Sequence, residues 1–416
     1  MLSDRSRRVI EATLPVVADN IEEIATRFYE HLFGEHPELL DGTFNRGNQA
    51  EKTQQMALAG SVALFASSLI KVPEQLPEHL LSRIAHKHAS LGITPAQYDV
   101  VHDNLFWAIV DVLGDAVTPE VAAAWDEVYW LMAYALINQE RGLYSAQGVR
   151  PETVWRAWEV AERHQETDDV VTFRMRRTDD RLVRTSLPGQ YVTVQVPMPD
   201  GVRQPRQFSL TKADDGDHRQ FSVKRVRGGG KPDGEVSNFL CDHAHVGDRL
   251  TMSLPFGDVV LDDSRPVVFA SAGIGVAPMA GMLSHLTAAR SQLPILFLHA
   301  DADESSFALR RQVLADVRAL RGAAAHVWYE HGTNTTMPVE VHPGVMNLDD
   351  VQLPREAVYH LCGPLPFMQG IRSSLIDRGV PARDIQYEVF GPDLWQADLA
   401  TEETPGASER GGRHSA

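Results

Sequence analysis

Apolar side chains recur at three- and four-residue intervals through the first 146 residues, which is the spacing of amphipathic helices. The clearest series are Ile21, Ile24, Ala25, Phe28 and Leu32; Leu105, Ile109, Val112 and Leu113; and Val128, Leu131, Met132, Ala135 and Leu136. Prolines occupy positions where such helices would begin or end, at Pro73, Pro77, Pro95 and Pro119. Because no strand-like alternation interrupts the pattern, residues 1–146 are predicted to form an all-α domain.

After Pro151 the pattern changes to short runs in which apolar and polar residues alternate. The runs are Val170–Met175, Gln190–Val196 and Gln220–Val226, with turn residues between them at Pro199-Asp200-Gly201 and Asp214-Asp215-Gly216. Short strands at this spacing are typical of a small antiparallel β-barrel, which we predict for residues 150–262.

From residue 263 onward the apolar runs become continuous, as in Val267–Ala270, Ile295–Leu298 and Val358–Leu361. Helical segments separate these runs, and buried strands that alternate with helices predict a parallel α/β sheet for residues 263–396. Residues 397–416 are polar and rich in Gly, Ser, Glu and Arg, so a disordered tail is predicted there. The fold class is therefore multidomain: all-α, then β-barrel, then α/β.

Composition limits the kinds of binding partner and the cellular compartment that we expect for this chain. A net charge of −17 over 416 residues argues against nucleic acid, whose phosphates would be repelled. The two cysteines, Cys241 and Cys362, are too few for a disulfide framework or a Cys-rich metal site and favour a reducing cytoplasm. The N-terminus lacks the apolar run of a signal peptide, and Leu293–Leu298 is too short to span a bilayer. We expect a cytoplasmic monomer without stable membrane association.

One predicted helix carries a histidine on its apolar face. The spacing divides it into an apolar face with Leu81, Ile84, His88 and Leu91, and a polar face with His79, Arg83, His86 and Ser90. His88 is therefore predicted to point into the core and His86 toward water. An inward histidine is either a hydrogen-bonded core residue or the axial ligand of a haem iron, and the residues alone leave both interpretations open.

Three stretches downstream are candidates for nucleotide binding. Arg206-Gln207-Phe208-Ser209, in the barrel region, resembles the flavin-binding R-x-[YF]-[ST] motif of ferredoxin-reductase-like enzymes. Gly228–Ser237 leads from glycines into a helix start. Such a helix start exposes backbone N–H groups to a pyrophosphate, although a flexible hairpin loop explains the glycines equally well. Ser271–Pro278 directly follows a buried strand and opens a helix, which is where a dinucleotide phosphate loop is expected.

In combination these segments resemble the flavohaemoglobins, in which a globin precedes a ferredoxin-reductase-like module. The resemblance covers residues 1–146 and about 150–392. It implies one haem b, one FAD and NADH or NADPH as cofactors, and O₂ and NO as small-molecule partners. The activity that it implies is that of a nitric oxide dioxygenase: electrons pass from the nicotinamide through FAD to haem iron, and O₂ oxidises NO to nitrate.

In the globin part the resemblance assigns a distal and a proximal set. On the distal side, Tyr29 and Gln54 would donate hydrogen bonds to the bound O₂, which carries partial negative charge. Phe44 would wedge against the haem, and Leu58 would lie one turn after Gln54.

On the proximal side, His88 would be the iron ligand, within Ile84-Ala85-His86-Lys87-His88. Tyr98 and Glu140 would hydrogen-bond its other ring nitrogen and raise its electron donation. Lys87 would point toward the flavin.

In the reductase part the resemblance assigns the flavin and nicotinamide contacts. Tyr191 would contact the flavin, Arg206 would pair with a flavin phosphate, and Ser209 would bond the isoalloxazine, with Gln207 and Phe208 between them. Further implied cofactor contacts are Gly234, Val236 and Ser237 at the pyrophosphate; Gly273, Ile274, Gly275 and Pro278 at the dinucleotide; Cys362, Gly363 and Pro364 at the nicotinamide; and Phe390, which would cover the flavin ring, with Gly391 and Pro392.

One residue departs from the usual flavohaemoglobin motifs, and one acidic segment bears on the choice between NADH and NADPH. Phe208 replaces a tyrosine, which removes one hydrogen bond worth roughly 0.5–1.5 kcal/mol, so weaker flavin binding is expected. Acidic residues in Asp301–Glu304 follow a strand where a ribose would lie and favour the free 2′-hydroxyl of NADH. Arg310-Arg311 lies close enough to leave NADPH open.

Two other functions fit the same motifs. One is an O₂ or NO sensor or carrier in which the reductase only keeps iron ferrous, although no output or DNA-binding segment is visible. The other is a general haem or flavin reductase that serves an external acceptor.

Overall fold

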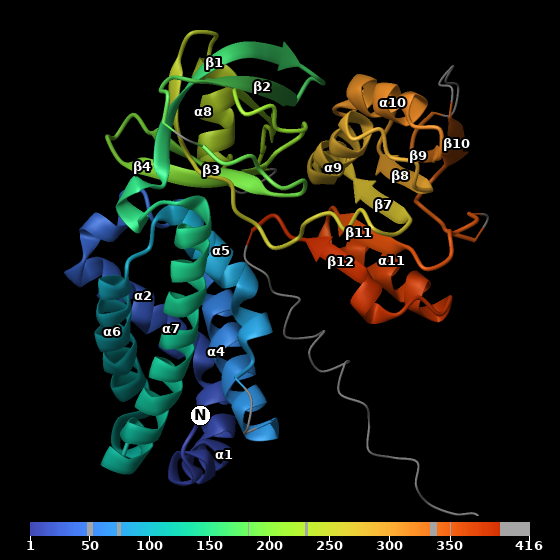
Figure 1. The fold of residues 1–416 in the computed structure, drawn as a ribbon. Helices are drawn as coiled ribbons and strands as arrows, with labels where there is room; N and C mark the ends of the chain where they lie inside the picture. Colours follow the sequence, from blue (N-terminus) through green and yellow to red (C-terminus); the bar gives the residue numbers. More distant parts are fainter. Residues whose placement is uncertain are drawn as a thin grey trace, which may run out of the picture.

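The computed structural model describes residues 1–47, 53–72, 76–181, 183–228, 232–332, 339–349 and 351–391, apart from the side chains of 53–56, 59 and 79. Pro73, Pro392 and the predicted tail at 397–416 lie outside the described residues. Within them, a helical domain is joined to a curled antiparallel sheet, and a parallel sheet follows (Figure 1).

The helical domain confirms the all-α prediction. Its elements are α1 (Asp4–Asp19), α2 (Ile21–Glu35), η1 (Pro37–Leu40), α4 (Thr53–Lys71), η2 (Glu78–Leu81), α5 (Ser82–Leu91), α6 (Pro95–Leu113), η3 (Gly114–Ala116) and α7 (Pro119–Gln147). Pro95 and Pro119 begin α6 and α7 as predicted, each after a threonine N-cap, because proline at the first helical position gives up no intrahelical hydrogen bond. The predicted apolar series meet in one core.

The second part is an antiparallel sheet of six strands in the order β4-β3-β6-β1-β2-β5. After η4 (Pro151–Thr153), its elements are β1 (Trp155–Gln165), β2 (Val170–Arg177), β3 (Tyr191–Pro197), β4 (Arg203–Ser209), β5 (His218–Lys224), α8 (Glu235–His243) and β6 (Arg249–Ser253). The sheet curls until its edges meet at a single bridge between Leu210 and Phe221, so the predicted barrel is closed only partly. Its interior is a continuous apolar core to which α8 contributes Val236 and Leu240.

The third part confirms the parallel α/β prediction, with strand order β10-β9-β8-β7-β11-β12. Its elements are β7 (Val267–Ala272), η5 (Gly273–Gly275), α9 (Val276–Ala288), β8 (Ile295–Asp301), α10 (Arg310–Ala319), β9 (Ala323–Tyr329), β10 (Glu340–Pro343), β11 (Val358–Cys362), α11 (Leu365–Asp377), η6 (Ala382–Asp384) and β12 (Ile385–Glu388). Helices α9 and α10 cover one face of the sheet and α11 the other. The proposed domain limits at 146, 150, 262 and 396 stay predictions.

The polar face of α5 corrects one prediction, because it contacts the barrel rather than water. His86 accepts a hydrogen bond at Nδ1 from the Gly257 N–H at 2.9 Å. The buried Ser90 hydroxyl accepts one from Thr193 on β3 at 2.7 Å. The amphipathic pattern identified the two faces of the helix correctly, but the second face is covered by another domain.

Candidate functional site

One cavity of about 290 Å³ runs from the interior of the helical domain to strand β4. Most of its wall is apolar and comes from α2, α4, α5, α6 and α7, while Pro205 and Gln207 close it on the sheet side. The sequence-predicted residues that line it are Tyr29, Phe44, Leu58, Lys87, His88, Tyr98, Gln207 and Gly391. Residues predicted to contact two different cofactors therefore lie around a single space.

His88, Tyr98 and Glu140 form a hydrogen-bonded group at the proximal wall. Nδ1 of His88 lies 2.9 Å from Oε1 of Glu140 and 3.0 Å from the Tyr98 hydroxyl. That hydroxyl also donates to Glu140 at 2.5 Å. Since Nδ1 is occupied by these partners, Nε2 is the nitrogen left to bind a metal.

Burial sets the electrostatics of this group. The Glu140 side chain is 3% exposed, and the hydrogen bonds that it forms with Tyr98 and His88 offset the cost of burying it. Burial, with the charge of Glu140 as second cause, raises the pKa of Tyr98 far above its usual range. Tyr98 therefore remains a hydrogen-bond donor at any physiological pH.

The distal wall is aromatic. Tyr29 is buried on α2, with its ring stacked on Phe33 at 5.7 Å and edge-on to Phe44 at 6.1 Å. Leu58 faces the same cavity from α4. Gln54 lies on the first turn of α4, and its side chain is outside the described part of the chain. Its predicted distal role stays a prediction.

Two half-buried cations, Lys87 and Arg206, lie near each other where the domains meet. Burial lowers the pKa of Arg206 to about 10. Burial, followed by the charge of Arg206, lowers the pKa of Lys87. Neither side chain forms an ion pair with a described residue, and the only hydrogen bond of the Arg206 guanidinium within this part of the chain goes to the Pro205 carbonyl at 2.7 Å. Such a pair provides a position for an anionic group.

The flavin motif lies on β4 directly beside β3. Tyr191 and Ser209 are partners in the antiparallel register. Gln207 donates to Thr193 at 3.2 Å. Phe208 stacks on Phe221 of the barrel at 5.2 Å, so its ring is held by packing and needs no hydroxyl for its position.

Helix α8 supplies the predicted pyrophosphate segment. Gly234 is its N-cap, and the Ser237 hydroxyl donates to the Gly234 carbonyl at 3.0 Å while accepting from the Val226 N–H. The Val236 side chain is fully buried in the barrel core, which leaves only its backbone N–H for a ligand. Gly229 and Gly230 lie outside the described residues.

The predicted nicotinamide segments lie at the carboxyl ends of the neighbouring strands β7 and β11. Gly275 is required there, because a Cβ atom would come within 2.2 Å of the Cys362 carbonyl oxygen. Gly273 and Ile274 form η5 with it, Pro278 is buried in α9, Gly363 follows β11, and Pro364 is the N-cap of α11. Cys362 is fully buried, and burial raises the pKa of its thiol, which makes it a packing residue.

The predicted ribose carboxylates follow β8, but each already has a partner in the chain. Asp301 lies 3.4 Å from Nε2 of His299, Asp303 accepts from Ser305 and Ser306, and Glu304 pairs with Arg310. The NADH preference therefore stays a prediction. Phe390 is 51% exposed next to Gly391, which lines the cavity.

Sequence reasoning missed Arg83, which joins α5 to the end of the parallel sheet. Its guanidinium donates to the Tyr387 carbonyl at 2.7 Å, lies 4.6 Å from the centre of the Tyr387 ring, and is 3.9 Å from the Asp258 carboxylate. Its place on the polar face of the helix was the available signal.

Within the part of the chain that the structure describes, every helix is too short or too polar to span a bilayer.

Comparison with known proteins agrees with this architecture. A globin family model matches residues 26–136, and an oxidoreductase FAD-binding domain model matches residues 157–260. The flavohemoprotein of Bordetella parapertussis is 39% identical over 94% of this chain and 99% of its own. That of Halalkalibacterium halodurans is 35% identical over 94% and 97%.

Two solved structures are also similar. The flavohemoglobin of Malassezia yamatoensis, with bound FAD and heme, superposes with a TM-score of 0.86 at 37% identity, over 94% of this chain and all of that one. The FAD/NAD binding domain of a nitric oxide dioxygenase from Vibrio cholerae matches with a TM-score of 0.53 at 32% identity, over 57% of this chain and 99% of that one.

Proposed function

The chain belongs to the flavohaemoprotein family, and on that premise we propose that it is a nitric oxide dioxygenase driven by NADH or NADPH. When bound, FAD divides a nicotinamide hydride into single electrons, and haem supplies the iron at which NO, O₂ and one electron give nitrate. The observation that carries the proposal is the single cavity from the His88 group to the flavin motif, since electron transfer needs the two cofactors close together.

The proximal residues fit a haem. His88 presents Nε2 to the cavity while Glu140 and Tyr98 hold Nδ1, so the ring is fixed in one tautomer and orientation. The buried Glu140 carboxylate makes the imidazole a stronger electron donor. On the distal side we assign Tyr29 and Gln54 as hydrogen-bond donors to the substrate oxygen, and Phe44 and Leu58 as the apolar wall.

The reductase residues fit a flavin dinucleotide and a nicotinamide. Arg206 and Lys87, neither of which forms an ion pair with a described carboxylate, suit phosphate or carboxylate groups of the cofactors. Exposed Phe390 suits an aromatic cover over a flavin ring, because an exposed phenylalanine gains by stacking. Gly273–Gly275 and Gly363, at adjacent strand ends, suit the nicotinamide dinucleotide.

The test is stopped-flow mixing of the holoprotein with NADH, O₂ and NO. We expect NO to accelerate NADH oxidation and nitrate to appear in step with NO loss. Tyr29→Phe removes the distal hydroxyl and should slow NO consumption by at least about 100-fold. Tyr134→Phe is the matched control, because Tyr134 is 57% exposed on α7, and its rate should not change.

Two outcomes would overturn the proposal. If NO leaves NADH oxidation unchanged while the protein binds the gas reversibly, the chain is a sensor or carrier. If NADH oxidation responds to an added electron acceptor but not to NO, the chain is a general reductase.

For its setting we propose a monomer in the cytoplasm, without nucleic acid or a stable membrane partner. The buried free thiols of Cys241 and Cys362 suit a reducing compartment, and the net charge of −17 disfavours polyanions. Light scattering after gel filtration measures the mass, and a dimer mass would contradict the monomer.

A further inference from the structure

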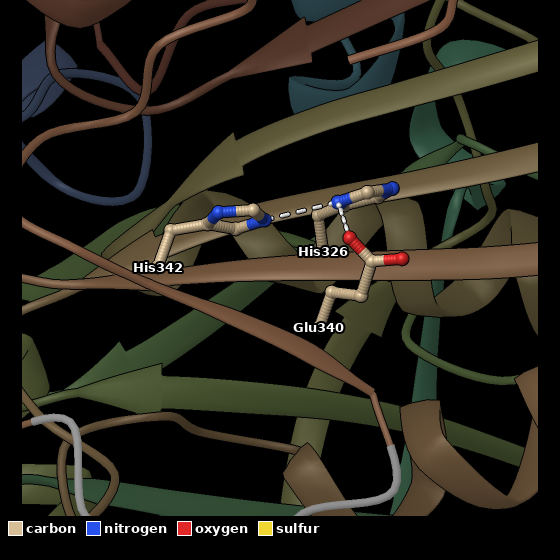
Figure 2. A group of neighbouring side chains, drawn as sticks. All are labelled: His326, Glu340 and His342. Atoms are coloured by element: carbon tan, nitrogen blue, oxygen red, sulfur yellow. Dashed lines mark hydrogen bonds and ion pairs between the residues drawn. The ribbon is translucent and has the colours of Figure 1, made fainter. Parts of the chain in front are cut away.

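A second group of histidine and carboxylate side chains lies at the edge of the parallel sheet, on β9 and β10. Glu340 on β10 pairs with His326 on β9, and His342 pairs with Trp328, in parallel register. Side chains two residues apart on a strand share a face, so all four lie on one face of the sheet. Figure 2 shows His326 between Glu340 and His342.

The ligand-forming atoms of this group converge. Nδ1 of His326 lies 3.0 Å from Nε2 of His342 and 3.3 Å from Oε2 of Glu340. One ligand atom from each of the three residues lies within 4.8 Å of the others. Two atoms bound to one tetrahedral Zn²⁺ at about 2.0–2.1 Å are roughly 3.3 Å apart, so these separations suit a shared ion.

We propose that His326, Glu340 and His342 bind a divalent late first-row transition metal ion, such as Zn²⁺, which fastens the edge strand β10 to β9. Two imidazole nitrogens and one carboxylate oxygen are a typical three-residue set for such ions, and water completes the tetrahedron. This site lies outside the proposed haem, flavin and nicotinamide contacts.

Hydrogen bonding alone serves this arrangement poorly. Nδ1 of His326 faces both the Glu340 carboxylate and a ring nitrogen of His342. With a proton it can donate to one of them, and without a proton it can accept only from His342. A metal ion takes a lone pair from each of the three groups at once.

Charge and packing favour the same occupant. The Glu340 carboxylate brings a negative charge beside the two imidazole rings, which a divalent cation offsets. The buried Trp328 stacks on the His342 ring at 4.7 Å and holds it in place.

The consequence for the fold is a stronger sheet edge. Strand β10 is four residues long and, among the described strands, pairs with β9 alone, so few backbone hydrogen bonds hold it. An ion bound across the two strands closes the chain between His326 and Glu340 and stabilises the folded domain by mass action.

The experiment uses the full-length holoprotein, treated with EDTA and then exposed to ZnCl₂. Calorimetric titration measures affinity, and elemental analysis after gel filtration gives zinc relative to haem iron. We expect one zinc per chain and a higher melting temperature of the reductase part. His342→Ala and Glu340→Gln should each weaken zinc binding by at least about tenfold. His245→Ala, an exposed histidine on another surface, is the control and should behave as the wild type.

X-ray absorption at the zinc edge should report nitrogen and oxygen neighbours at about 2.0–2.1 Å with imidazole scattering. NADH-dependent reduction of ferricyanide establishes that each variant is folded. The proposal is wrong if the wild-type protein takes up no zinc at micromolar concentrations. It is equally wrong if His342→Ala and wild type bind zinc alike.

Discussion

The group at His88 and the group at His326 both combine histidine with glutamate, but the carboxylate lies in a different place in each. In the helical domain Glu140 lies behind His88, bonds Nδ1 and is 3% exposed. At the sheet edge Glu340 lies beside two imidazoles, and its side chain is 72% exposed. A buried carboxylate behind the ring orients and strengthens a single ligand, whereas an exposed one beside the rings is itself a ligand. The position of the carboxylate relative to the imidazole therefore indicates whether it adjusts the properties of a histidine ligand or binds the metal itself.

Reciprocal removal of one histidine from each group gives the largest expected effect. His88→Ala should abolish haem binding, since no other described imidazole is held at the proximal wall, and leave zinc binding intact. His342→Ala should do the reverse. The Soret absorbance and zinc content of both variants measure this. Loss of both metals in either variant would show that the two groups are not independent.

His360 extends the comparison to a histidine that forms no ion pair with a described carboxylate. It is fully buried on β11, and neither ring nitrogen has a hydrogen-bond partner among the described residues. Burial lowers its pKa from 6.5 to about 4. The unfolded chain therefore binds this proton more readily, so stability is intact above pH 6.5 and falls as the pH drops toward 4. The loss is about 3 kcal/mol.

Denaturant unfolding of the reductase part at pH 7 and pH 4 measures this effect. His360→Phe removes the titrating group and should lose about 3 kcal/mol less than the wild type over that range. Equal pH dependence in the two proteins would contradict the buried, unpartnered state of His360.

The smallest expected effect comes from replacing Glu140, and it should distinguish the role of Glu140 from that of Glu340. Glu140→Gln keeps an acceptor for Tyr98 but removes the charge behind His88, so the haem should be retained while NO consumption falls about 10- to 100-fold. Potentiometric titration should give a higher iron reduction potential, which a purely structural role would not produce. Glu340→Gln is the control and should change neither quantity. If Glu140→Gln and Glu340→Gln consume NO at similar rates, the two carboxylates do not have the different roles assigned to them.

Much of the fold was predictable because periodicity reports burial directly. The apolar series and the prolines located α6 and α7, and the continuous runs located β7, β8 and β11. The pattern could not say what covers a polar face, so His86 was wrongly expected to face water although it contacts Gly257. Val236 fits a binding motif by position, yet its side chain belongs to the barrel core.

The candidate site was predictable only where one element carried the signal. His88 was recognisable on a single helix face, whereas Tyr98 and Glu140 required the family pattern, because their meeting depends on how three helices pack. The group at His326 was missed for the same reason. Its members come from two strands whose pairing and register are decided by tertiary structure.

Helix α5 has ten residues, and within them His88 faces the cavity while Ser90 bonds Thr193 of the barrel. Thr193 in turn accepts from Gln207 in the flavin motif. The helical domain and the barrel are therefore not interchangeable modules, since residues of one short helix contact both the cavity and the barrel. A chimera that exchanges the globin of one relative for that of another should keep α5 and β3 as a matched pair. A substitution that becomes fixed on this helix during evolution must therefore be compatible with both the cavity and the barrel.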